Sequence, residues 1–145
     1  MIILDTNVVS DAFQPRPNEL VRSWLDRFPH EDLFICAPVL AEMRFGIERL
    51  PAGRRRNELE RLVTHAETRL FQDRVLAFDR ECAHAFGRIV SKRMDAGRPI
   101  MPMDALIASI AVANKMAIAT RDIADFSGLE IELINPFDPP DLRSR

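Results

Sequence analysis

No apolar run in the sequence approaches the ~20 residues that a membrane-spanning helix requires. The first residues contain no basic stretch followed by a long apolar segment, so we expect no signal peptide and a cytoplasmic protein without membrane contacts. Only two cysteines are present, Cys36 and Cys82, and their apolar surroundings in the sequence predict reduced core residues. Three scattered histidines (His30, His65 and His84) complete no spacing typical of a zinc site.

Lysine is also scarce, since Lys92 and Lys115 are the only lysines among the 20 basic residues. A net charge of −2 argues against a protein that merely coats nucleic acid. Arginine binds phosphate well, but an arginine-rich composition can also reflect genomic bias, so this imbalance carries little weight. The sequence has no Walker A loop, no glycine-rich dinucleotide turn and no Ser/His/Asp set, so nothing supports those three kinds of site.

Strand-like apolar segments alternate with segments of helical periodicity along the 145 residues, a length that suits one domain. We predict short strands near residues 2–4, 33–36, 74–78, 116–120 and 131–134. Helices are predicted near residues 8–13, 18–28, 37–50, 54–70, 79–96 and 103–113. This alternation indicates a three-layer α/β fold, in which helices cover both faces of a central five-stranded parallel sheet. The predicted domain spans residues 1–137, and residues 138–145 form a tail expected to be partly disordered.

Four carboxylates lie where predicted strands end or helices begin. Asp5 directly follows the first strand, and Asp122 follows the fourth. Glu42 lies one turn into the helix after the second strand, and Asp104 lies in the first turn of an otherwise apolar helix. Because ligands bind beyond the carboxyl ends of parallel strands, these positions are consistent with one shared site at that edge.

Simpler roles stay open for some of these acids. Thr6 or Asn7 would cap the first helix while Asp5 complements its dipole, and Asp104 would do the same at its own helix. Glu42 lies about 200° around its helix from Leu40 and therefore points away from the predicted core stripe. That stripe consists of Leu40, Met43, Ile47 and Leu50.

Four neighbouring acids without a lysine or histidine would repel one another and raise at least one pKa. A divalent cation removes this conflict, and a carboxylate-rich set of oxygen ligands suits Mg²⁺ or Mn²⁺. Such an ion lowers the pKa of an attacking water, and two ions about 4 Å apart stabilise both the entering and the leaving oxygen of a phosphate displacement. These residues therefore predict metal-dependent phosphodiester hydrolysis.

Five segments also carry a resemblance to a known family, and they span nearly the whole chain in the family's order and spacing. They are Ile3-Leu4-Asp5-Thr6-Asn7, Ala41-Glu42-Met43-Arg44-Phe45-Gly46-Ile47, Met103-Asp104-Ala105-Leu106-Ile107-Ala108, Ala119-Thr120-Arg121-Asp122 and Asn135-Pro136-Phe137. The sequence resembles PIN-domain endoribonucleases, and more closely the VapC toxins in the branch of FitB. This resemblance implies that the metal-binding quartet is Asp5, Glu42, Asp104 and Asp122, supported in an outer shell by Thr6, Asn7 and Thr120.

The resemblance further implies cleavage of single-stranded RNA, a homodimer that brings two acidic grooves together, and inhibition by a small antitoxin. In the FitB branch the antitoxin has a ribbon-helix-helix fold, contacts operator DNA on behalf of the toxin and directs an arginine toward the acids. Many family members have Asn in place of Asp122, so the fourth acid is expected to tune metal affinity and to be dispensable for chemistry.

Several arginines are candidate phosphate contacts, although an ordinary surface role stays open for each. They are Arg44, Arg49, Arg54, Arg55, Arg56 and Arg121. Two alternatives to a nuclease also stay open: a catalytically weak module that binds a partner and represses a promoter, and a phospho-receiver domain with Asp79 as acceptor. An aspartyl-phosphate phosphatase would need a second acid at position 7, where Asn7 stands.

Overall fold

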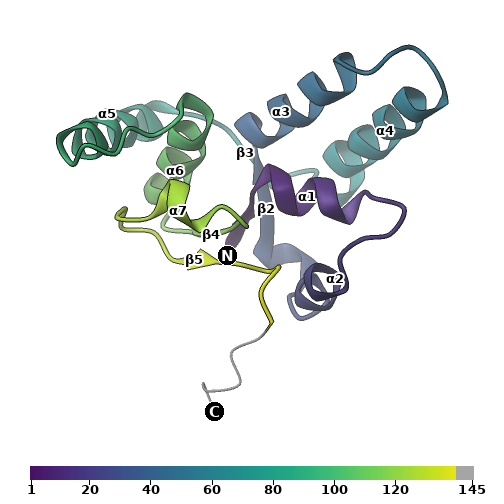
Figure 1. Cartoon of the computed structure of the whole chain (residues 1–145), viewed down its shortest axis with the longest axis horizontal. Coiled ribbons are helices and arrows are strands. Elements are labelled where there is room, and N and C mark those ends of the chain that lie inside the picture. The colour runs from purple at the N-terminus through teal and green to yellow at the C-terminus, as the bar shows by residue number, and fades with distance from the viewer. Residues whose placement is uncertain (140–145) are drawn as a thin grey trace.

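The structure is a computed structural model that describes residues 1–139, and its centre is one sheet of five strands. The strands pair in the order β3-β2-β1-β4-β5, and every neighbouring pair is parallel, which confirms the predicted sheet (Figure 1). Their bounds are β1 Ile2–Leu4, β2 Leu33–Cys36, β3 Val75–Leu76, β4 Ala117–Ala119 and β5 Leu133–Ile134. Most of the predicted tail, residues 140–145, lies outside the described residues.

Helices connect the strands and separate into two groups in Figure 1, with α1–α4 on the right of the view and α5–α7 on the left. Their bounds are α1 Thr6–Ala12, α2 Glu19–Leu25, α3 Ala37–Glu48, α4 Arg54–His65, α5 Arg80–Asp95, α6 Pro102–Asn114 and α7 Ile123–Phe126. A 3₁₀ turn, His30–Asp32, precedes β2, and a π-helical turn, Ala66–Leu70, continues α4.

The strand order reverses at β1, because the chain adds β2 and β3 on one side of it and β4 and β5 on the other. Right-handed crossovers in opposite directions place their helices on opposite faces of the sheet, which produces the three layers. Such a reversal also opens a crevice beyond the carboxyl ends of the two strands that flank it. Here these strands are β1 and β4, paired in register from Ile2 with Ala117 to Leu4 with Ala119.

The core is built around α6, which was predicted to be buried because it is apolar on nearly every side. Its side chains from Ala105 to Ala111 include five fully buried apolar residues. The one buried polar residue among them, Ser109, donates its hydroxyl to the Ala105 carbonyl and so costs no unpaired group. Pro102 in the first turn and the left-handed Lys115 at the C-cap delimit this helix. Asp104 is thereby fixed to the most buried helix of the fold.

The structure differs from the predicted elements mainly at the edges of the sheet. The strands β3 and β5 have two residues each, shorter than predicted, because an edge strand pairs on one side only. The short helix α7 was not predicted, and α2 ends at Leu25, before the expected residue 28. Met43 and Ile47 are buried as predicted, but Leu40 and Leu50 are partly exposed, and Val39 completes the buried face of α3.

Both cysteines are buried and free, as predicted. Among residues 1–139, no helix combines the length and apolar character needed to cross a membrane.

Candidate active site

Asp5 lies at the carboxyl end of β1, at the reversal of strand order. Its backbone N–H donates to the Ala119 carbonyl of β4 (3.0 Å), so the position of Asp5 is set by the sheet. The side chain is only 6% exposed, and its Oδ1 accepts the Thr6 backbone N–H (2.8 Å). Asp5 is therefore the N-cap of α1, and the alternative in which Thr6 or Asn7 caps this helix is wrong, because both lie inside it.

The surroundings of Asp5 shift its pKa in opposing directions. Burial raises the pKa above its ordinary value, because a carboxylate loses hydration in the interior. The Thr120 hydroxyl donates to Asp5 Oδ2 (2.6 Å) and lowers the pKa, as does the hydrogen bond from Thr6. The negative charges of Glu42 and Asp122 raise it again. Three of the four predicted acids therefore interact electrostatically.

Asn7 joins the ends of β1 and β4. Its Nδ2 lies 2.8 Å from Asp5 Oδ2, 3.1 Å from Thr120 Oγ1 and 3.1 Å from Asp122 Oδ2, and its Oδ1 accepts the Arg121 backbone N–H (3.1 Å). On the β4 side, Thr120 Oγ1 also accepts the Asp122 backbone N–H (3.0 Å). Asn7 and Thr120 thus hold Asp5 and Asp122, which are 117 positions apart in the sequence, near each other at the carboxyl ends of β1 and β4.

Glu42 of α3 is linked to the same region through Thr6. The Thr6 hydroxyl donates to Glu42 Oε2, which ties the start of α1 to the middle of α3. The side chain is partly exposed, while Met43 beside it is buried, so Glu42 faces away from the core as its helical position predicted.

Asp104, in the first turn of α6, is close enough to the other acids for their charges to affect its pKa. Partial burial raises the pKa of Asp104 to about 6, and the charges of Asp125, Asp5, Glu42 and Asp122 contribute in that order. Asp104 accepts no hydrogen bond from any residue between 1 and 139, so both its oxygens stay available to a ligand. Asp125 of α7 was missed by the sequence analysis. It lies three residues after Asp122, a spacing that could have drawn attention to it.

The donor set has the chemistry that a hard divalent cation prefers, because every member is a carboxylate oxygen. Besides Asp104, the outer oxygens Glu42 Oε1 and Asp122 Oδ1 accept no hydrogen bond from the described residues. Within residues 1–139, however, no three acidic, histidine or cysteine side chains converge tightly enough to enclose an ion. Cys36 is close enough for Asp5 and Glu42 to affect it, but burial raises the pKa of its thiol to about 12, so it stays protonated and is a poor ligand.

Comparisons with known proteins show the family of the chain. The family model described as PIN domain matches residues 2–130. The chain belongs to the PIN domain family. The VapC ribonuclease Y4jK of Sinorhizobium fredii is 34% identical over 96% of this chain and 99% of its own length. Toxin FitB of Neisseria gonorrhoeae is 36% identical over 94% of this chain and 99% of its own length.

Solved structures give the same family relationship in three dimensions. A structure of FitAB bound to an IR36 DNA fragment superposes on this PIN domain with a TM-score of 0.89. The match is 37% identical and covers 96% of this chain and 97% of the matched chain. The predicted PIN-like architecture is therefore confirmed.

The candidate arginines of this PIN domain differ in how far they are already engaged. Arg44 joins α3 to α4 through an ion pair with Glu60 (2.5 Å) and to the π-helical turn through one with Glu67 (2.7 Å). Arg56 pairs with Glu48 (2.5 Å) and also donates to the Leu50 carbonyl (3.3 Å). These contacts stabilise the α3–α4 pair.

The other candidate arginines are more open. Arg49, Arg54 and Arg55 are exposed, and Arg55 has only a 3.7 Å contact with Glu58. Arg121 is also exposed and lies over the Phe137 ring, 4.8 Å from its centroid, next to Asp122. A role in RNA binding stays a prediction for all of them.

The receiver alternative loses its structural basis in this fold. A receiver places its acceptor after a middle strand, whereas Asp79 follows β3 at the edge of the sheet. Its carboxylate caps α5 by accepting the Cys82 backbone N–H (3.0 Å), which lowers the pKa of Asp79. Asp79 therefore has an ordinary capping role.

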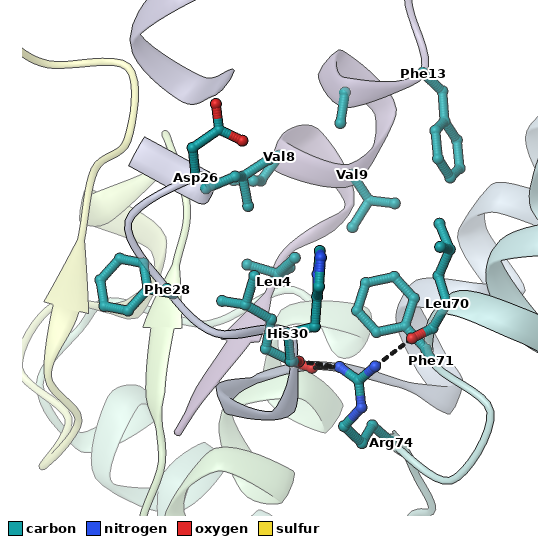
Figure 2. Close-up of a pocket in the computed structure, with 13 residues that line it drawn as sticks. Leu4, Val8, Val9, Phe13, Asp26, Phe28, His30, Leu70, Phe71 and Arg74 are labelled. Atoms are coloured by element: carbon teal, nitrogen blue, oxygen red, sulfur yellow. Dashed lines mark hydrogen bonds between the residues drawn. The ribbon is translucent and has the colours of Figure 1, made fainter. Parts of the chain in front are cut away.

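A separate apolar cavity of about 270 Å³ lies between α1, α2 and the π-helical turn (Figure 2). Leu4 lines it, but Asp5 does not. Arg74 lies at one end and donates to the carbonyls of His30, Leu33 and Leu70, which leaves its guanidinium little capacity for a ligand (Figure 2). None of the four candidate acids lines this cavity.

Proposed function

We propose that this PIN domain is a Mg²⁺- or Mn²⁺-dependent endoribonuclease that hydrolyses single-stranded RNA and acts as the toxin of a toxin–antitoxin pair. The observation that supports this most is that the charges of Glu42 and Asp122 act on both Asp5 and Asp104, although the four acids come from distant segments of the chain. None of these acids has an ion pair with an arginine, lysine or histidine within residues 1–139.

In this proposal Asp5 and Asp104 are the principal metal ligands, Asp122 completes the site, and Glu42 is a ligand or a base acting through water. When bound, the divalent ion neutralises charge on the scissile phosphate and makes water a better nucleophile. The protein contributes the positions of the oxygens: Thr120 and Asn7 orient Asp5, Asn7 orients Asp122, and the Thr6 hydroxyl orients Glu42. Such preorganisation matters because small displacements of reacting groups are costly in rate.

The proposed partner is a small DNA-binding antitoxin that inhibits a homodimer of this PIN domain and contacts the operator. The named relatives support it, since FitAB was solved with a DNA fragment and FitB is named a toxin. The alternative of a catalytically weak, partner-binding corepressor uses the same complex without cleavage. It predicts normal cell growth when the protein is induced alone, whereas an active toxin predicts growth arrest.

The deciding experiment maps RNA ends after incubation with the purified full chain, first in EDTA and then in excess Mn²⁺. We expect new internal ends only with Mn²⁺, and none with Asp5→Asn, which keeps the shape of the side chain but not its charge. Equal melting temperatures of the metal-free proteins would show that the variant is folded. An Asp5→Asn protein that is fully active and free of contaminating nuclease would refute the proposed site.

A further inference from the structure

A groove of about 230 Å³ lies between α1, α3 and α4. Thr6 and Glu42 line one part of it, so it is continuous with the candidate active site. Apolar side chains, among them Ile47 and Leu59, also line it. Ser10, Gln14 and Arg55 supply a hydroxyl, an amide and a cation to the same groove.

Gly46 helps to keep this groove open. It lies within α3 among the lining residues, and a Cβ added there would have no neighbouring atom within 4 Å. Glycine inside a helix costs about 1 kcal/mol relative to alanine, so neither packing nor helix stability accounts for it here. A larger side chain at position 46 would project into the groove without displacing the core.

An endonuclease acts on a strand that continues on both sides of the cleaved bond, so neighbouring nucleotides must leave the acids along some surface. The groove adjoins Glu42, and its chemistry matches a nucleotide. Apolar walls suit the faces of a base, while Ser10 and Gln14 can each donate to and accept from its edges. Arg55 is exposed, and its 3.7 Å contact with Glu58 leaves the guanidinium available to a phosphate.

On the basis of the nuclease function proposed above, we propose that this groove binds the base of one nucleotide flanking the scissile phosphate, and that Arg55 contacts the phosphate beyond it. Among the described residues that line the groove, Arg55 is the one cation and Glu42 the one carboxylate, so the groove offers a positive charge to a phosphate. Gly46 is then a specificity-determining position, because it leaves room for the base.

The test combines Gly46→Leu with RNA oligonucleotides that carry a single abasic site at each position around the cleaved bond. With wild-type protein and Mn²⁺, we expect one abasic position to lower kcat/KM about 10- to 100-fold, the usual worth of one seated base. Gly46→Leu should show a similar loss on intact RNA and no further loss at that abasic position. Gln14→Ala, at an exposed residue beyond the end of α1, should lower kcat/KM about threefold to tenfold, as expected for one hydrogen bond.

The matched control is Gly87→Leu on α5. Gly87 is also an exposed glycine inside a helix whose added Cβ would have no neighbour within 4 Å, but it does not line the groove. The Gly87→Leu protein should cleave RNA with the kcat/KM of the wild type. Melting temperatures of all variants would show whether a loss of kcat/KM reflects unfolding. If Gly46→Leu is unfolded, the result for Gln14→Ala decides whether the groove binds substrate.

Three results would overturn the proposal in distinguishable ways. If wild type cleaves RNA and both Gly46→Leu and Gln14→Ala match it, the groove does not bind substrate, while the nuclease function stands. If these variants cleave normally but lose inhibition by the protein partner, the occupant is a peptide. If wild type cleaves no RNA, the proposed function fails and the groove assignment fails with it.

Discussion

Replacing Asp104 with asparagine should stabilise the metal-free protein, although it should abolish cleavage. Asp104 has no hydrogen-bond donor among the described residues, and burial together with the charges of four other acids raises its pKa from 3.8 to about 6. The folded state therefore holds a proton there that the unfolded state releases at lower pH. As pH rises from about 4 to about 6, this difference lowers the free energy of unfolding of the wild type. Asparagine carries no charge, so the free energy of unfolding of the variant does not fall in this way as pH rises.

The size of the effect follows from the shift. About two pKa units correspond to about 3 kcal/mol at full weight, but Asp104 is only half buried, and solvent screening reduces this to about 1 kcal/mol. For a protein of this size, 1 kcal/mol raises the melting temperature by roughly 3 °C. A bound divalent cation should make the wild type more stable than the variant. A ligand at 100 times its dissociation constant adds about 2.7 kcal/mol to the free energy of unfolding of a protein that binds it.

The assay is thermal unfolding of wild type and Asp104→Asn in EDTA at several pH values from 4 to 8, repeated in excess Mn²⁺. The advantage of the variant in EDTA should be small at pH 4, grow to about pH 6 and stay constant above it. In Mn²⁺ at pH 8, the wild type should be the more stable protein. A variant that is less stable than wild type in EDTA at pH 8, or an advantage independent of pH, would refute the electrostatic reasoning.

Two further substitutions test the supporting residues. Thr120→Val removes the hydroxyl that lowers the pKa of Asp5. The acidic limb of the profile of kcat/KM against pH should therefore move to higher pH. An unmoved limb would show that Asp5 does not titrate in catalysis. Arg93→Met should lower the free energy of unfolding, measured by urea titration, by about 3 kcal/mol. The buried guanidinium of Arg93 donates to three carbonyls, those of Arg98 (2.6 Å), Asp125 (3.1 Å) and Ser127 (2.8 Å), and methionine cannot replace these hydrogen bonds. A loss below about 0.5 kcal/mol, the size typical of a surface substitution, would contradict the role of Arg93 in holding α7.

The sequence was sufficient to predict the sheet and to place Asp5 and Asp122 at the same edge of it, because both depend on rules that act locally. Short apolar runs ending in polar residues predicted β1 and β4, and parallel pairing then required Asp5 and Asp122 to lie at the same edge. The orientation of Glu42 followed from helical periodicity, although the buried face of α3 includes Val39 where Leu40 was expected. Asp104 was recognisable as the one acid in an apolar helix.

The features that were missed depend on tertiary contacts. Nothing local in the sequence shows that Arg93 is buried, because its partners are backbone carbonyls, one of them 34 residues away at Ser127. The same contacts fix α7, which brings Asp125 toward Asp104, so the fifth acid was missed for the same reason. The groove beside Glu42 also has no sequence signal, since Gly46 alone is a weak indication of open space.

The hydrogen bonds around the acids explain how the fold tolerates them while leaving them able to bind a cation. Asp5, Glu42 and Asp122 are held by neutral donors from Thr6, Asn7 and Thr120. A lysine in the place of Asn7 would relieve the repulsion more fully, but its fixed charge would occupy the space that a divalent ion needs. Neutral donors orient the carboxylates and leave most of their negative charge uncompensated. Stability is thereby given up at the edge of the sheet where, in the proposed function, a cation would restore it.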